Sequence, residues 1–187
     1  MDVIRAIQER RAYRSLAPVE ITKDLISDLA ESTQLTPSCS NFQPWRFVFV
    51  SDPGVLEDMH AALSEGNAWA RAASLIIAVF TRQEDDCVIR DRIYHQFDTG
   101  MSVGFLLLRA TELGLVAHPI AGFSPKKARE VLGIPDGYQV ITLIIVGQHA
   151  DVPGPELSEK QLAQEKKRPE RKPLDEFIFL DRCTLKG

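Results

Sequence analysis

The chain has 187 residues, 44% hydrophobic and 26% charged, which is typical of a folded globular protein and argues against disorder. Its 22 Lys+Arg and 26 Asp+Glu give a formal net charge of −4, so bulk attraction to nucleic acid or to an anionic membrane is not expected. The length favours a single domain over residues 1–187, able to bury about 70% of its unfolded surface without metal or disulfide.

The first half of the chain predicts alternating helices and strands. Apolar residues in Val3–Ile7 indicate a short opening helix, and Thr22 is a candidate N-cap for the next one. Residues 47–50 form a short apolar strand. Asp52 and the proline after it can begin a third helix. Residues 74–80 predict a second, strongly apolar strand.

The longest helical pattern runs from about Arg90 to Leu113, with a glycine after it as a C-terminal signal. Residues 105–108 are apolar all round, which predicts burial on every side. Gly100 and Gly104 reduce helix propensity, so they indicate close packing of this helix against another element.

The last part of the chain predicts a helix, a strand and an arm. A serine and a proline open a helix that ends at Leu132, and residues 138–147 form a third strand. Residues 148–187 are polar and rich in proline, then apolar again over residues 177–180, so we expect an extended arm that covers the body or a partner. Periodicity alone leaves α+β and α/β both open.

Cysteine and histidine usage argues against a metal site. Cys39, Cys87 and Cys183 have unrelated spacings, which indicates neither a disulfide framework nor a zinc cluster, and the four histidines are scattered singly. Charged residues occur within the first five positions, so no N-terminal signal pattern is expected. No apolar run approaches the ~20 residues that are needed to span a bilayer. We expect a cytoplasmic protein with reduced thiols.

Common catalytic signatures are also missing. The sequence has no glycine-rich dinucleotide fingerprint, no P-loop, no G-x-S-x-G elbow and no H-E-x-x-H pair. A standard dinucleotide-binding fold, a P-loop nucleotidase and a zinc protease are therefore not indicated.

Two basic clusters could bind an anion. Arg10 and Arg14 lie on the same side of the chain whether the segment is helical or extended, and two guanidinium groups suit a phosphate. The second cluster comprises Lys166–Arg168 and Arg171–Lys172. Taken alone, the first cluster is better explained as a solvated basic surface, and the second as a soluble linker.

The segment "TPSCSNFQPW", residues 36–45, is a polar loop framed by Pro37 and Pro44. It displays hydroxyl and amide groups, including those of Ser38 and Asn41. Such a loop is either a plain connection or a binding surface.

This segment resembles the "APSxxNxQPW" motif of the FMN-dependent nitroreductase family. Four further pieces follow that family's order along almost the whole chain: "ERRAYRSL", "EGNAWA", "LGLVAHPIAGF" and "RKPLDEF". The resemblance implies an α+β fold with a central, mostly antiparallel sheet flanked by helices. It also implies a homodimer with the long central helix at the interface and a flavin at each subunit boundary.

The resemblance assigns cofactor-binding roles. The early arginines and a C-terminal basic residue would bind the FMN phosphate, the Pro-Ser-x-x-Asn loop would come from the neighbouring subunit, and Asn67 would reach the isoalloxazine ring. A backbone N–H of the 119–122 turn would face flavin N5. Ala12 stands where serine is common, and Ala121 where many relatives carry Glu. The implied residues are Arg10, Arg11, Ala12, Arg14, Pro37, Ser38, Cys39, Asn41, Asn67, Pro119, Ile120, Ala121, Gly122, Arg171 and Lys172.

The implied activity is an FMN-dependent oxidoreductase that uses NADH or NADPH to reduce nitroaromatics, quinones or similar acceptors by a ping-pong mechanism. No side chain is assigned a catalytic role, because the flavin carries the redox chemistry. Three alternatives remain: a flavoenzyme of the same fold with specialised oxidation or fragmentation chemistry, a non-catalytic flavin-binding protein, and a structural dimer that has lost flavin.

Overall fold

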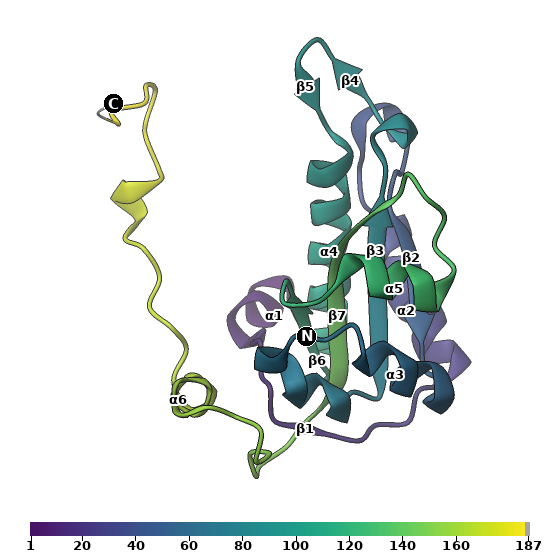
Figure 1. Cartoon of the computed structure of the whole chain (residues 1–187). Helices are drawn as coiled ribbons and strands as arrows, with labels where there is room; N and C mark the ends of the chain where they lie inside the picture. Colours follow the sequence, from purple (N-terminus) through teal and green to yellow (C-terminus); the bar gives the residue numbers. More distant parts are fainter. Residues whose placement is uncertain (186–187) are drawn as a thin grey trace.

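The computed structural model describes residues 1–185, and its centre is an antiparallel sheet (Figure 1). The longest strand, β7, pairs with three others, and β3 also pairs with β2. Every pairing is antiparallel, which with the flanking helices confirms the α+β class. The strands of this sheet are β1 (Leu16–Ala17), β2 (Arg46–Val50), β3 (Leu75–Thr81), β6 (Val116–Ile120) and β7 (Gln139–His149).

Side-chain caps begin the main helices where the sequence predicts them. Thr22 Oγ1 accepts from the Leu25 N–H at 3.1 Å, and Asp52 Oδ1 accepts from the Gly54 N–H at 2.9 Å. Gly133 ends a later helix with φ of 63°. The helices are α1 (Val3–Glu9), α2 (Lys23–Gln34), α3 (Pro53–His60), α4 (His95–Glu112), α5 (Pro125–Leu132) and α6 (Glu159–Lys166).

The sheet has a helical layer on each face (Figure 1). Alternate residues of β3 point to opposite sides, so Leu75 and Ile77 pack with α2 and α4, whereas Ile76 and Ala78 pack with α3 and α5. All four of these β3 side chains are fully buried. The core therefore lies on both faces of β3 and β7.

The longest helix begins at His95, not near Arg90 as its apolar pattern predicts. Residues 88–93 form a small hairpin instead, with β4 (Val88–Ile89) paired to β5 (Arg92–Ile93). Arg90 has φ of 61°, a left-handed conformation that a helix excludes. The apolar residues of the hairpin have a spacing that is compatible with a helix, but they are exposed and do not form a buried helical face.

The outer face of α4 is open, contrary to the expectation of burial on every side. Phe97 is 62% exposed and Phe105 is 42% exposed. A Cβ atom built on Gly100 or Gly104 would meet no atom within 4 Å, so no element of residues 1–185 packs closely on these glycines. The close packing of another element on Gly100 and Gly104 that the sequence predicts is therefore not found within residues 1–185 of a single chain.

The polar C-terminal segment contains a helix that the sequence interpretation treated as linker. Ser158 and Gln161 form a capping box, in which the Ser158 N–H donates to Gln161 Oε1 at 2.9 Å. After α6 the chain extends away from the body, with a short 3₁₀ turn at Leu174–Glu176 (Figure 1). Within residues 1–185, no helix is both long and apolar enough to cross a membrane.

Cys39 and Cys87 form a disulfide with a Cα–Cα distance of 6.0 Å, so the expectation of reduced, unrelated cysteines is wrong for this pair. The register of the sheet explains the proximity. Arg46, the first residue of β2, pairs with Phe80 near the end of β3. Cys39 lies seven residues before Arg46 and Cys87 lies seven residues after Phe80, so both cysteines lie beyond the same edge of this strand pair. Cys183 is free and exposed.

Candidate functional site

A basic cavity of about 220 Å³ lies between the segment after α1 and the segment that ends α6. Three of its arginines precede β1 in the chain, and two follow α6. The cavity is lined by Arg10, Arg11, Ala12, Arg14, Gln164, Arg168, Pro169 and Arg171. Residues about 150 positions apart in the sequence thus build one concave surface.

No carboxylate of the described residues forms an ion pair with an arginine of this cavity. The arginine ion pairs found in residues 1–185 involve other positions on the molecule, and none includes an arginine of the cavity. Burial lowers the pKa of the Arg10 guanidinium, and the charges of Arg168, Arg171 and Arg11 lower it further. A cluster of mutually repelling, partly buried guanidinium groups is a strong binding site for an anion, above all a phosphate.

Helix α6 fixes the shape of the cavity. Glu165 accepts from the backbone N–H groups of Arg14 at 2.8 Å and Ser15 at 3.2 Å. The Arg11 Nη2 donates to the Gln164 carbonyl at 2.8 Å, at the C-terminal end of α6, where a cation is favoured. Glu165 therefore positions the backbone of the arginine segment, although its charge also raises the pKa of Arg14 against the larger lowering effect of burial.

A second feature is the turn after β6, where Gly122 lies against Asn67. Asn67 Nδ2 donates to the Gly122 carbonyl at 2.9 Å, and Trp69 Nε1 donates to Asn67 Oδ1 at 3.1 Å. A Cβ on Gly122 would lie 2.5 Å from Asn67 Nδ2, so only glycine fits there. The Asn67 amide is therefore held in place by the turn itself.

The cavity and this turn are neighbours on one surface. His118 of β6 contacts the Tyr13 carbonyl through Nδ1 at 3.0 Å and packs on the Trp69 ring at 4.8 Å between centroids. Because a carbonyl can only accept, His118 carries its proton on Nδ1. Gln161 of α6 also donates to the Gly66 carbonyl at 3.0 Å.

The Pro-Ser-x-x-Asn loop lies at the opposite end of the sheet. Thr81, the last residue of β3, donates to the Pro44 carbonyl at 3.1 Å and pairs with Gln139. The basic segment instead leads into Leu16, which pairs with His149 at the far end of β7. At roughly 3.3 Å per residue, the ends of β7 are about 30 Å apart. One bound molecule the size of a mononucleotide cannot touch both places on a single chain.

The implied cofactor residues thus fall into three places. Arg10, Arg11, Ala12, Arg14 and Arg171 line the cavity, whereas Lys172 pairs with Glu176 at 3.4 Å and is not part of its lining. The turn contributes Pro119, a half-buried residue of β6, exposed Ala121, and Gly122, while the side chain of Ile120 is buried in the core. The loop holds Pro37, Ser38, Cys39 and Asn41.

Arg168 is a site residue that the sequence interpretation did not assign. Its Nη2 donates to the carbonyls of Gln8 and Arg10, the latter at 2.8 Å, so it ties the two sides of the cavity together. The capping box at Ser158 is a sequence signal for α6, and Arg168 lies two residues beyond the end of that helix at Lys166.

Comparison with known proteins gives consistent matches. Residues 7–148 match the model of the Nitroreductase family. A Thermus thermophilus protein named NADH dehydrogenase is 25% identical over 182 residues, covering 81% of this chain and 88% of its own. The putative NAD(P)H nitroreductase MhqN of Bacillus subtilis is 25% identical over 209 residues, covering 92% and 95%.

A solved structure described as an oxidoreductase containing FMN is similar at a TM-score of 0.82 and 28% identity, covering 100% of this chain and 94% of that one. A nitroreductase family protein from Clostridium difficile 630 has the same fold, at a TM-score of 0.78 and 21% identity over 98% of this chain and 100% of that one. These similarities confirm the resemblance and the fold that the motifs predict.

Proposed function

The chain belongs to the nitroreductase family of oxidoreductases, and we propose that it is a homodimeric, FMN-dependent enzyme that oxidises NADH or NADPH. Its acceptors would be nitroaromatics, quinones or similar small molecules, reduced in a separate half-reaction. The names of the relatives, an NADH dehydrogenase and a putative NAD(P)H nitroreductase, support the use of a nicotinamide donor.

The observation that carries this proposal is the arginine cavity. Its guanidinium groups have no carboxylate partners in residues 1–185, and its volume of about 220 Å³ suits a phosphate with part of its attached chain. Arg10 and Arg14 would hold the phosphate from one side, and Arg168 and Arg171 from the other. The donor set fits the phosphate monoester of FMN.

The ring system would lie over the neighbouring turn. Asn67 is held at the edge of that turn by Gly122 and Trp69, and Ala121 is exposed beside it. FMN, when bound, supplies the redox chemistry by accepting hydride from a nicotinamide and passing electrons to an acceptor. The protein's own residues bind and orient, and none is assigned as acid or base.

A second copy of the chain would complete each site. The loop with Ser38 and Asn41 and the arginine segment lie at opposite ends of β7, which are about 30 Å apart, so the loop would contribute to the site of a partner. The open face of α4, with its exposed Phe97 and Phe105 and its uncovered glycines, offers an apolar surface for that partner. The exposed residues Phe177 and Ile178 of the arm are a further apolar surface of the same kind.

An anaerobic absorption spectrum tests the function. The purified protein should show a flavin spectrum that bleaches when NADPH or NADH is added and returns when a quinone follows. A flavin spectrum that persists with both nicotinamides would favour the alternatives of specialised chemistry or non-catalytic flavin binding. A protein that takes up no flavin from excess FMN would refute the proposal.

A further inference from the structure

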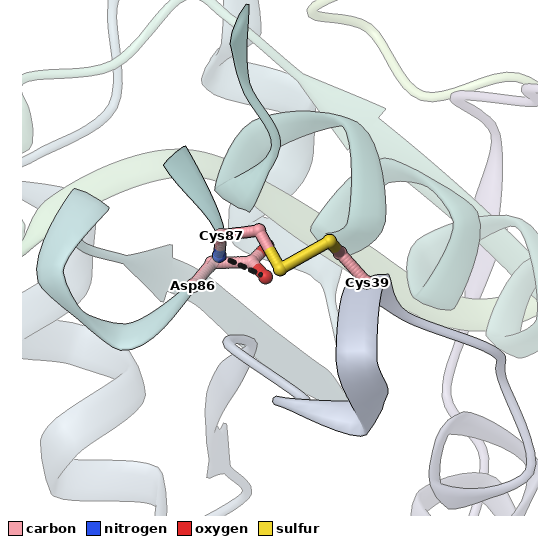
Figure 2. Close-up of side chains that lie close together, drawn as sticks. All are labelled: Cys39, Asp86 and Cys87. Atoms are coloured by element: carbon pink, nitrogen blue, oxygen red, sulfur yellow. Dashed lines mark hydrogen bonds between the residues drawn. A yellow bond between two sulfur atoms is a disulfide. The ribbon is translucent and has the colours of Figure 1, made fainter. Parts of the chain in front are cut away.

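The disulfide between Cys39 and Cys87 lies beside a carboxyl group (Figure 2). Both sulfur atoms and a carboxylate oxygen of Asp86 lie within 4.8 Å of one another. All three residues are partly exposed. Cys87 Sγ also lies 3.6 Å from the Ser40 hydroxyl, at the exposed side of the pair.

The environment of Asp86 raises the pKa of its carboxyl group. Its Oδ1 accepts the Cys87 N–H at 2.7 Å, whereas its buried Oδ2 has no partner among the described residues. Burial raises the pKa of Asp86, and the neighbouring charge of Asp98 raises it further, against the opposing effects of the Cys87 N–H and of His95. Asp98 and His95 both come from α4, the helix packed beside the pair.

Backbone contacts keep the two cysteines together without the S–S bond. The Cys39 N–H donates to Asp98 Oδ2 at 2.6 Å, which anchors the loop to α4. The Tyr94 N–H donates to the Cys87 carbonyl at 3.3 Å, closing the base of the β4–β5 hairpin. After reduction, the two thiols therefore stay close enough to form the bond again.

We propose that Cys39 and Cys87 are a redox-active pair that exchanges two electrons with an external dithiol, with Asp86 as its proton donor and acceptor. A thiolate of the dithiol attacks one sulfur, the S–S bond breaks, and the departing cysteine sulfur takes the proton of Asp86. The Asp86 carboxylate then takes the proton of the reagent's second thiol, which attacks the mixed disulfide and releases the other cysteine as a thiolate, and this thiolate takes a proton from water. The products are two cysteine thiols and one oxidised reagent.

Counting alkylated cysteines by mass spectrometry tests the pair directly. Protein purified without reductant and alkylated after unfolding should carry one label, on Cys183, because the other two of its three cysteines are joined. Folded protein treated with dithiothreitol before alkylation should carry three. Three labels without reductant would mean that the thiols are free or hold a metal, and one label after dithiothreitol would mean an inert bond. Either result would overturn the proposal, and neither depends on flavin content.

The variant Asp86→Asn tests the proton donor. We expect dithiothreitol to reduce the pair on the order of 100-fold more slowly than in the wild type, at a rate that rises more steeply with pH because it follows the thiolate fraction of the reagent alone. The matched control is Asp91→Asn, an exposed aspartate in the turn of the same hairpin, which should reduce at the wild-type rate. Reduction of Asp86→Asn at the wild-type rate and pH dependence would remove Asp86 from the proposal.

Discussion

Arg168 has two roles in the basic cavity. Its guanidinium adds positive charge, and its hydrogen bonds to the carbonyls of Gln8 and Arg10 fix the segment that carries the other arginines. Each charge-assisted hydrogen bond contributes about 1.5–3 kcal/mol to binding, which is roughly a 10- to 150-fold change in affinity.

The variant Arg168→Ala should therefore weaken FMN binding by roughly 10- to 150-fold, as measured by the recovery of flavin fluorescence during dilution. Lys172→Ala is the matched control, because Lys172 lies in the same basic stretch but pairs with Glu176 outside the cavity. Equal loss of FMN in both variants would show that general positive charge, not the cavity, holds the phosphate.

His118 links the cavity to the turn and makes stability depend on pH. It is 7% exposed, and burial lowers its pKa from 6.5 to about 4. Between pH 6.5 and 4 the unfolded chain binds a proton that the folded chain does not. The free energy of unfolding should therefore fall as the pH falls through this window, by about 3 kcal/mol, and the His118 contribution should level off below it.

Urea unfolding of His118→Asn at several pH values checks this expectation. Asparagine can still donate to the Tyr13 carbonyl but does not titrate. The variant should lose less stability than the wild type between pH 6.5 and 4, whatever its stability at pH 7. An unchanged pH dependence would place the titration in other groups.

At the scale of single residues, the sequence predicts the cavity only in part. Arg10, Arg14 and Arg171 are identified through the resemblance, because their motifs are short and local. Arg168 is not, because its role depends on a helix in a segment whose polar composition favours a linker. The Cys39–Cys87 pair was missed because the spacing of 48 residues is uninformative until the register of β2 and β3 is known.

At the scale of elements, α4 is the informative helix. Phe105 lines an apolar groove of about 480 Å³ between α4, α1 and the end of α2. Its exposure, with that of Phe97 and the uncovered glycines, makes this face the expected centre of the proposed dimer. A charge placed there would have to be buried without a partner, which costs several kcal/mol.

The variant Phe105→Glu should therefore run as a monomer in size-exclusion chromatography with light scattering, and it should lose its FMN. Lys126→Glu on α5 places the same side chain on the opposite helical layer and should remain a flavin-containing dimer. A dimeric, flavin-containing Phe105→Glu protein would contradict the use of this face.

The starts of α2, α3 and α5 are predicted well, because Thr22, Asp52 and Ser124 cap these helices locally. The hairpin before α4 is not predicted, since its exposed apolar residues continue the helical period of the residues that follow. The open face of α4 was predicted to be buried, and the physical reason for the error is that its apolar pattern does not distinguish packing within a chain from packing between chains.

At the scale of the whole molecule, the proposed function requires each chain to carry two separate half-sites. The arginine segment leads into the sheet at the His149 end of β7, the Asn67 turn follows Ile120, which pairs with Leu143 farther along β7, and the Pro-Ser-x-x-Asn loop lies near the Gln139 end. A symmetric pair of chains can bring the cavity of one copy to the loop of the other twice. The proposed enzyme therefore depends on association, not on any one chain.

The most direct test is the FMN content of a mixed dimer. One chain would carry Arg10→Ala and Arg14→Ala, the other would carry Ser38→Ala and Asn41→Ala, and two different affinity tags would isolate the pair. Each variant alone should bind no FMN. The mixed dimer should recover half of the wild-type FMN content, because one of its two sites combines an intact cavity with an intact loop. A mixed dimer without FMN would contradict the account, since it would mean that each site takes both halves from the same chain.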